Sequence, residues 1–197
     1  MINLALDLAS TIRHDGNGGV ADDLAAPAGL TTWVRDRADA LGPWAAAFTA
    51  DSRALADVTS LRAGVRALFA RAVRPAPPSR ADADRLLPLP EALTRVNDAA
   101  AQVPTTPRLT WAEQGEPAAR PEHGTAAPAT LLTAALARAT IDFLTGPDRA
   151  DLRSCTAPRC VRYFVKGHGR QEFCKPSCSN RARVARHYQR QHENQAG

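Results

Sequence analysis

The four cysteines are the residues with the most distinctive chemistry in this chain of 197 residues. Thiolates are soft ligands, and four of them complete the tetrahedral shell of a structural zinc ion. Four thiolates also leave no open position of the kind that a catalytic zinc keeps. All four lie within the last 43 residues, in the spacing C-x4-C, thirteen residues, C-x3-C, as Cys155, Cys160, Cys174 and Cys178. The spacing therefore predicts a structural Zn2+ site formed by these side chains.

Two disulfides, or four unrelated thiols, are the alternatives to a metal site. Disulfides are rare in a reducing cytoplasm, and the clustering of the cysteines speaks against unrelated thiols. His168 or His187 is an alternative fourth ligand, because imidazole nitrogen also binds zinc. Oxidation of the thiolates with release of zinc, a redox-sensing role, is a further alternative.

A hairpin is expected between the two cysteine pairs. The aromatic and β-branched residues 163–165 favour a strand, and the Gly-His-Gly stretch 167–169 favours a turn. Residues 171–173 are expected to form the return strand. Such a hairpin would bring the two pairs of thiolates together.

A basic helix is predicted directly after the last cysteine pair. Pro176 suits the first turn of a helix, and Ser177 or Ser179 is a candidate cap. A basic stripe falls within an arc of roughly 100°; it consists of Arg183, Arg186, His187 and Arg190. With Lys175 and Arg170 from the preceding segment, this stripe suits the phosphates of nucleic acid. A solvated surface helix is the alternative.

The opposite side of this helix is expected to be structural. An apolar stripe is formed by Val184, Ala185 and Tyr188. We expect it to pack on the cysteine-containing segment or on the rest of the chain. Arg181 lies on the same side, close to Cys178, and is expected to bond to carbonyl groups near the cysteines or to an acidic residue. A similar local role is expected for Asn180.

Positive charge is concentrated in the cysteine-containing segment. Residues 152–193 contain ten Lys and Arg against two Asp and Glu, whereas the remainder contains fifteen and eighteen. A mildly acidic body joined to a strongly basic tail indicates that the tail meets a polyanion, such as DNA.

The rest of the chain reads as a mainly α, multihelical domain with a small β-hairpin segment. Apolar residues at helical spacing, bounded by Gly and Pro, predict most of the helices; they are expected over 2–13, 28–41, 51–73, 80–87, 89–102 and 127–144. Residues 14–23 are expected to be a loop, and a strand is expected over 108–112. The predicted domains are 1–147 and 148–197. The short link between them predicts that the finger docks on the helical domain.

Other functions find little support in the sequence. It contains no phosphate-binding glycine motif, no nucleophile elbow and no paired acid–base constellation, so an enzyme is not expected. No apolar run is long enough to span a membrane, and the N-terminus does not read as a signal peptide, so a cytoplasmic protein is expected. Asp7, Arg13 and His14 are candidates for lining a pocket for a small-molecule effector; a local polar network is the alternative.

Two motifs resemble a known pair of bacterial domains. The stretches "CTAPRC" and "FCKPSCSNRARVARHYQR" resemble the CGNR zinc finger, with the signature present as Cys178-Ser179-Asn180-Arg181 and Ser in place of the usual Gly. The N-terminal stretches "LALDLASTIRHD" and "DDLAAPAGLTTWVRD" resemble the opening of the ABATE domain, which precedes this finger. The family opening usually reads Leu-Asp-Phe-Val-Asn-Thr, whereas residues 6–11 here read Leu-Asp-Leu-Ala-Ser-Thr.

The resemblance implies a stress-linked bacterial transcription regulator with a mostly helical body and a treble-type or knuckle-type finger. On this hypothesis the finger and its basic helix bind DNA, and the body senses a ligand or forms a homodimer. The alternative hypothesis is a protein-interaction module whose arginines pair with an acidic partner protein.

Overall fold

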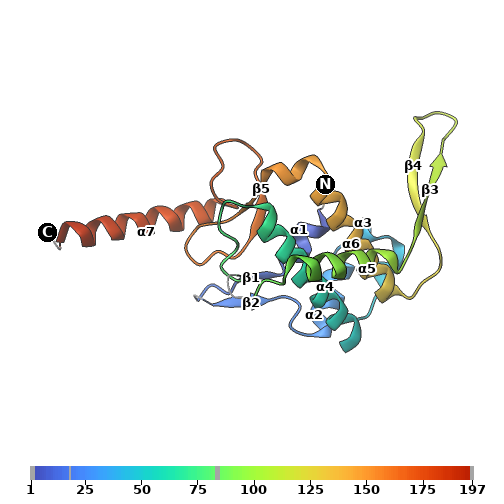
Figure 1. The fold of residues 1–197 in the computed structure, drawn as a ribbon, viewed down its shortest axis with the longest axis horizontal. Coiled ribbons are helices and arrows are strands. Elements are labelled where there is room, and N and C mark those ends of the chain that lie inside the picture. Colours follow the sequence, from blue (N-terminus) through green and yellow to red (C-terminus); the bar gives the residue numbers. More distant parts are fainter. Residues whose placement is uncertain (1–2, 18, 83–84, 196–197) are drawn as a thin grey trace.

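The fold is a helical body from which one long helix and one hairpin project. The computed structural model describes residues 3–17, 19–82 and 85–195. Its α-helices are α1 (Leu4–Ala9), α2 (Pro27–Arg35), α3 (Ala38–Leu41), α4 (Ser52–Ala72), α5 (Leu89–Ala101), α6 (Pro128–Thr145) and α7 (Pro176–Gln195), and its 3-10 helices are η1 (Pro43–Ala47) and η2 (Pro147–Asp151). Helix α7 and a hairpin formed by β3 (Thr105–Thr110) and β4 (Ala118–His123) extend from opposite ends of the body (Figure 1). The predicted mainly α fold is confirmed.

The described strands form three separate antiparallel hairpins. In the first, β1 (Ile12–His14) pairs with β2 (Val20–Asp22), and Arg13 lies opposite Ala21. The projecting hairpin aligns Arg108 with Arg120. The third pairs β5 (Leu152–Ser154) with β6 (Tyr163–Val165).

Helix α4 lies at the centre of the body and follows the predicted range closely. The Asp51 carboxylate caps its first turn by accepting a hydrogen bond from Ala54 N at 2.7 Å. Helices α1, α5 and α6 pack around it. The core that they share includes Leu8, Phe69 and Leu136, and it extends to Tyr163 of β6. The cysteine-containing segment thus contributes directly to the core of the body.

Three predictions for the N-terminal half are wrong in part. The helix expected over 2–13 ends at Ala9, because Thr11 turns back to hydrogen-bond the carbonyl of Leu8 and the chain then enters β1. The loop expected over 14–23 contains β2. The helix expected over 28–41 is divided between α2 and α3, and Arg37, at the break, pairs with Asp7 at 3.0 Å.

No helix forms over the described part of 80–87, where turns replace the predicted short helix. Ser79 and Asp82 are instead hydrogen-bonded by the buried guanidinium of Arg66, which fixes an irregular path. The return strand expected over 171–173 is also absent, because β6 pairs with β5. The Gln171 side chain holds this segment as a loop by accepting from Gly167 N and donating to the Phe173 carbonyl.

The exposed part of α7 differs from the prediction of an apolar stripe packed against protein. Val184 and Tyr188 are 53% and 59% exposed, and the buried side chains of α7 among those described are Cys178 and Ala182. The reason is that the helix leaves the body after its first two turns (Figure 1). Among the described residues, no helix has the length and apolar character needed to cross a membrane.

Candidate metal centre and basic surface

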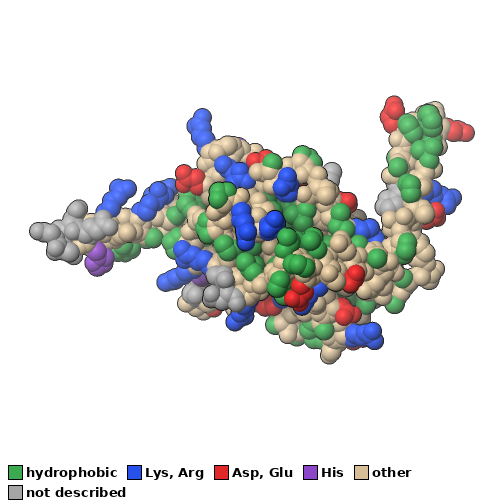
Figure 2. Space-filling view, viewed as in Figure 1, with side chains coloured by type: hydrophobic (Ala, Val, Ile, Leu, Met, Phe, Trp, Pro, Cys, Tyr) green, Lys and Arg blue, Asp and Glu red, His purple; other side chains and the backbone are tan. Residues whose placement is uncertain are grey.

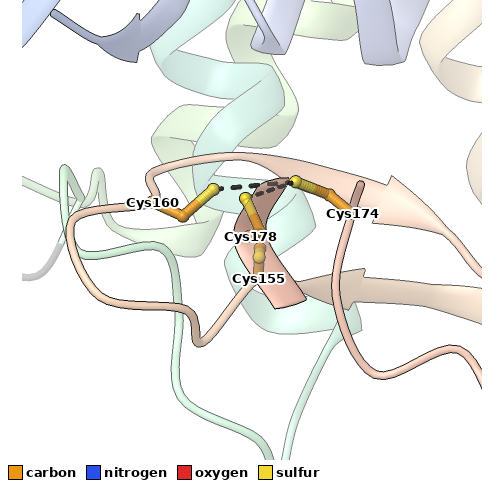
Figure 3. Close-up of side chains that lie close together, drawn as sticks. All are labelled: Cys155, Cys160, Cys174 and Cys178. Atoms are coloured by element: carbon orange, nitrogen blue, oxygen red, sulfur yellow. Dashed lines mark hydrogen bonds between the residues drawn. The ribbon is translucent and has the colours of Figure 1, made fainter. Parts of the chain in front are cut away.

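The four cysteines converge on one point at the base of α7. Their Sγ atoms all lie within 4.8 Å of one another (Figure 3). Neighbouring contacts are 3.7 Å between Cys160 and Cys174 and 3.5 Å between Cys174 and Cys178. Tetrahedral zinc with Zn–S bonds of about 2.3 Å places its sulfur ligands about 3.8 Å apart. The donor set and its spacing therefore fit a tetrahedral metal ion.

Local backbone structure positions each pair of sulfurs. Cys155 directly follows β5, and its N–H donates to the Arg162 carbonyl at 2.9 Å. The turn to Cys160 passes through Arg159, whose φ of 63° is left-handed. On the other side, Cys174 precedes α7 and Cys178 lies in its first turn. Neither Ser177 nor Ser179 caps the helix, because α7 already begins at Pro176.

The thiols are free of disulfides and are mostly buried. Mutual hydrogen bonds, chiefly with Cys155, lower the pKa of the Cys160 thiol strongly and raise that of Cys174. The hydrogen bond with Cys160 raises the pKa of Cys155 to about 11. Protons shared among adjacent sulfurs in this way are those that a bound metal ion displaces.

The signature residues Asn180 and Arg181 have different environments. Arg181 donates through Nη2 to the Cys178 sulfur at 3.0 Å, and this bond raises the pKa of the guanidinium. The expected partners, carbonyl groups or an acidic residue, are therefore replaced by a metal-site sulfur. Asn180 is exposed, and its side chain bonds to none of the described residues. Ser179, which replaces the usual Gly, lies inside the helix, where no left-handed backbone is needed.

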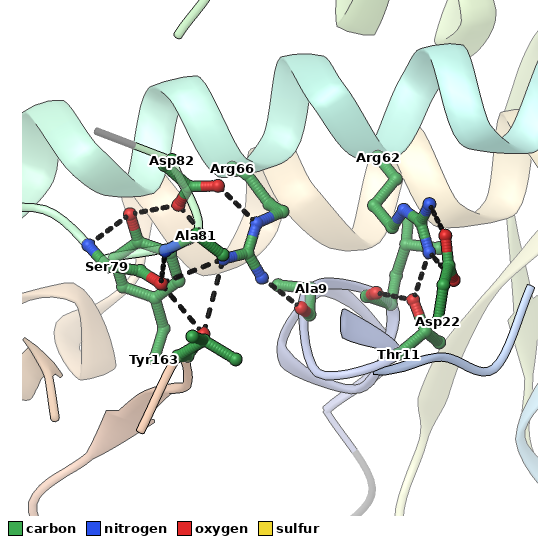
Figure 4. Close-up of polar contacts among 11 residues, drawn as sticks. Ala9, Thr11, Asp22, Arg62, Arg66, Ser79, Ala81, Asp82 and Tyr163 are labelled. Carbon is green, nitrogen blue, oxygen red and sulfur yellow. Dashed lines mark hydrogen bonds and ion pairs between the residues drawn. The ribbon is translucent and has the colours of Figure 1, made fainter. Parts of the chain in front are cut away.

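A buried polar network fixes the finger to the body (Figure 4). Arg66 of α4 is 3% exposed and makes two hydrogen bonds to Asp82, at 2.6 and 3.0 Å. The same guanidinium donates to the Val161 carbonyl, as does Ser79 Oγ. Tyr163 donates its hydroxyl to Asp82 at 2.7 Å. Burial and the neighbouring Asp82 charge raise the pKa of Tyr163, so its hydroxyl stays protonated.

Sequence reasoning missed this network, although one signal was available. Arg62 and Arg66 stand four residues apart on the side of α4 that also carries Val58 and Val65. Charged residues on a buried helix face are uncommon unless they are paired. Arg62 is paired too, since its guanidinium contacts both carboxylate oxygens of Asp22, at 2.6 and 2.7 Å.

The predicted basic residues lie on and beside α7. Figure 2 shows Lys and Arg side chains along this helix and on the adjoining part of the body. Arg170, Lys175 and Arg186 line a hollow of about 430 Å³ at the helix base. The remaining stripe residues also lie on α7 and are exposed; they are Arg183, His187 and Arg190.

The three candidate pocket residues are not brought together. Asp7 pairs with Arg37, within the helical body. Arg13 and His14 instead line a different cavity, next to Cys160 and Arg181.

Two family models match the chain. The ABATE family, described as "Putative stress-induced transcription regulator", matches residues 3–147. The CGNR zinc finger matches residues 152–191, a range that contains all four cysteines. Neither description names an enzyme. No curated protein gives a significant match. Because the first model covers well over half of its length, the chain belongs to the ABATE family and carries a CGNR zinc finger.

Proposed function

We propose that this protein is a zinc-containing, DNA-binding transcription regulator whose α7 contacts the phosphate backbone in a DNA groove. The observation that carries the proposal is a projecting helix with exposed Arg183, Arg186 and Arg190, whose first turn contains the metal ligand Cys178. Zinc is the metal proposed, because four closely spaced thiolates are its preferred structural set. The setting would be the bacterial cytoplasm, and no enzymatic activity forms part of the proposal.

The shape of α7 supports insertion into a groove. A helix of 20 residues is about 30 Å long, and the major groove of B-DNA, about 12 Å wide, admits one helix. A helix in a groove meets nucleic acid on much of its circumference, which suits a segment exposed on all sides from Arg183 to His192. Bound zinc would fix the start of the helix, and the Arg66 network would fix its direction relative to the body.

In such a regulator the helical body would have a role separate from DNA binding. We propose that it senses a small-molecule effector or forms a homodimer, so that the state of the body is transmitted to α7. The route for this would be the contact of Arg66 and Ser79 with the backbone of Val161, one residue after the ligand Cys160.

Titration of labelled DNA with zinc-loaded protein across a salt series tests the proposal. Phosphate contacts release counterions, so affinity should fall steeply with salt. Changing Arg183, Arg186 and Arg190 together to Ala should lower the slope of log K against log salt by about three, because each phosphate contact contributes about 0.9. The protein should keep its zinc, measured by elemental analysis.

A matched triple variant controls for the change in net charge. Arg53, Arg71 and Arg149 are exposed on the body, and changing them to Ala removes the same charge. This variant should bind DNA with the wild-type salt slope. Wild-type binding by the α7 variant would refute the role of the stripe.

Docking to an acidic partner protein is the second candidate function. The exposed Val184 and Tyr188 favour it, because apolar side chains on a basic helix suit a protein surface. Changing Val184 and Tyr188 to Ser would then weaken partner binding strongly. On the DNA hypothesis this change leaves the salt slope intact.

A further inference from the structure

A cavity of about 440 Å³ lies where the first hairpin meets the zinc finger. Its walls come from three segments that are distant in the sequence. Residues 13–16 at the end of β1 form one wall, and the segment at Cys160 and Arg162 forms another. The third consists of Lys175 and the start of α7 as far as Arg181. It is therefore a junction between the ABATE domain and the finger.

Positive charge dominates this cavity. Four cationic side chains line it against two anionic groups, the Asp15 carboxylate and the Cys160 thiolate. Arg13 is paired outside the junction with Asp23, at 2.6 Å. Arg162 and Lys175, by contrast, form no ion pair or side-chain hydrogen bond with the rest of the described chain. Two cations are thus available to a ligand.

Two buried N–H donors in the cavity walls also lack partners. Among the described residues, the buried side-chain atoms with no hydrogen-bond partner are His14 Nε2 and Arg181 Nε. His14 Nδ1 accepts a hydrogen bond from Gly16 N at 2.8 Å, so the proton of the neutral ring must lie on Nε2. Both unpartnered atoms are therefore donors, and both belong to residues lining the same cavity.

We infer that this cavity binds an oxyanion, with a phosphoryl group as its ligand class. Phosphate oxygens accept charge-assisted hydrogen bonds from guanidinium, ammonium and imidazole N–H groups, which are the groups left free here. A bound oxyanion would supply the acceptor that the buried His14 and Arg181 N–H groups lack among the described residues. The phosphoryl group has two sources, a small phosphorylated molecule or the DNA backbone near α7.

Binding at this cavity would couple the two parts of the molecule. Arg181 donates through Nη2 to Cys178 and carries its free Nε–H on the same guanidinium. An anion held between His14 and Arg181 would therefore link β1 of the body to a metal-ligand residue at the start of α7. The inference does not depend on the proposed function, because a free oxyanion would bind here even if α7 bound no DNA.

Nuclear magnetic resonance of histidine-labelled, zinc-loaded protein tests the site with inorganic phosphate at constant ionic strength. The His14 ring resonances should move saturably, while those of His123, on the distant hairpin, stay in place. Changing Arg162 and Lys175 to Ala should weaken this binding by about tenfold or more, since two charge-assisted contacts are lost. Changing Arg53 and Arg71 to Ala should leave it unchanged. No saturable movement of His14, or equal movement in the Arg162 and Lys175 variant, overturns the inference.

Lys175→Ala alone is a second variant, which should also weaken phosphate binding and which spares the half-buried Arg162. Its zinc content verifies that the finger is folded. The source of the phosphoryl group follows from adding duplex DNA. Competition between DNA and inorganic phosphate at His14 identifies the DNA backbone, whereas independent binding identifies a small molecule. The variant lacking Arg183, Arg186 and Arg190 should retain phosphate binding at His14, so failure of the DNA proposal is distinguishable from failure of this site.

Discussion

Arg66 is a charged side chain in the core, and its surroundings explain why it is tolerated. It donates to Asp82, Ser79 and the carbonyls of Ala9 and Val161, so its hydrogen-bonding capacity is largely used. A buried ion pair adds little net stability compared with apolar residues, but the loss of one partner is costly. The network therefore joins α4 to the backbone of Val161 through bonds whose loss should be costly.

The hydroxyl of Tyr163 offers a clean test of this network. Tyr163→Phe removes the donor to Asp82 and the acceptor of the Ser79 N–H, leaving buried groups unpartnered. The expected loss of unfolding free energy is about 1–3 kcal/mol, measured by urea denaturation. Tyr188→Phe, at the exposed tyrosine of α7, should change stability by less than about 0.5 kcal/mol. Equal effects of the two changes would contradict the structural role of Tyr163.

Asp22 gives a pH-dependent prediction. Burial raises its pKa, but hydrogen bonds from Arg62 and Leu24, with the Arg62 and Arg66 charges, outweigh this and hold the pKa below its ordinary value. A carboxyl whose pKa is lowered on folding stabilises above its unfolded pKa and loses that contribution as pH falls through the folded value. Asp22→Asn should therefore cost about 0.5–1.5 kcal/mol at pH 7, because bonds to the buried Arg62 guanidinium are weakened while solvent screens the exposed Asp22 carboxylate.

The difference between wild type and Asp22→Asn should begin to shrink as pH falls below about 4, because the carboxyl of the unfolded chain then binds a proton, and it should vanish once pH is below the lowered pKa of the folded state. Urea denaturation of both proteins between pH 3 and 7 measures the difference. A constant difference across this range would show that the Asp22 charge does not stabilise the fold.

At the scale of elements, long periodic segments were predictable and short ones were not. The 51–73 prediction approaches the limits of α4 because its apolar residues repeat over many turns and Asp51 supplies a cap. The range predicted for helix α1 was too long. Leu4 and Leu8 fit a helix, but the hydrogen bond from the Thr11 hydroxyl to the Leu8 carbonyl lies at its end. The strand predicted over 163–165 is β6, but its pairing with β5 was missed, because that pairing depends on docking against α4 rather than on a local turn.

The packing of α2 against the segment that follows the first hairpin requires a glycine at position 29. A Cβ at Gly29 would lie 2.1 Å from the backbone carbonyl oxygen of Asp23, so the two segments could not keep their spacing. Gly29→Ala should therefore destabilise the protein by about 1–3 kcal/mol, measured by thermal or urea unfolding. Gly124→Ala is the matched control, since nothing lies within 4 Å of its Cβ position. A neutral Gly29→Ala would mean that α2 can shift without loss.

For the whole molecule, the candidate site was partly readable from the sequence. The spacing of the cysteines predicted that four sulfurs gather, because thiolates in two short-spaced pairs share a metal. The junction cavity was not predictable, since His14, Arg162 and Arg181 come from segments whose contact depends on tertiary docking. Asp7 was expected to line a pocket with Arg13 and His14, yet it pairs with Arg37 in the fold.

Two separate apolar clusters predict how the molecule responds to metal removal. Leu152 and Tyr163 belong to the core of the body, whereas Cys155, Ala157, Cys160, Phe164 and Cys178 form a small cluster of their own. Zinc binding supplies on the order of 10 kcal/mol to the folding of small thiolate modules. Without the metal, the small cluster should lose its order while the core of the body persists.

Chelation of zinc, or Cys178→Ser, should therefore expose the amides of residues 155–160 and 174–182 to hydrogen exchange, with protection retained in α4, α5 and α6. Deuterium uptake measured by mass spectrometry resolves these segments, and restoring zinc to the chelated wild-type protein should recover protection. Ser179→Ala is the control, because this side chain is outside the metal-binding group and should leave exchange unchanged. Loss of protection in α4 together with the finger would instead mean that the Arg66 network makes body and finger one cooperative unit.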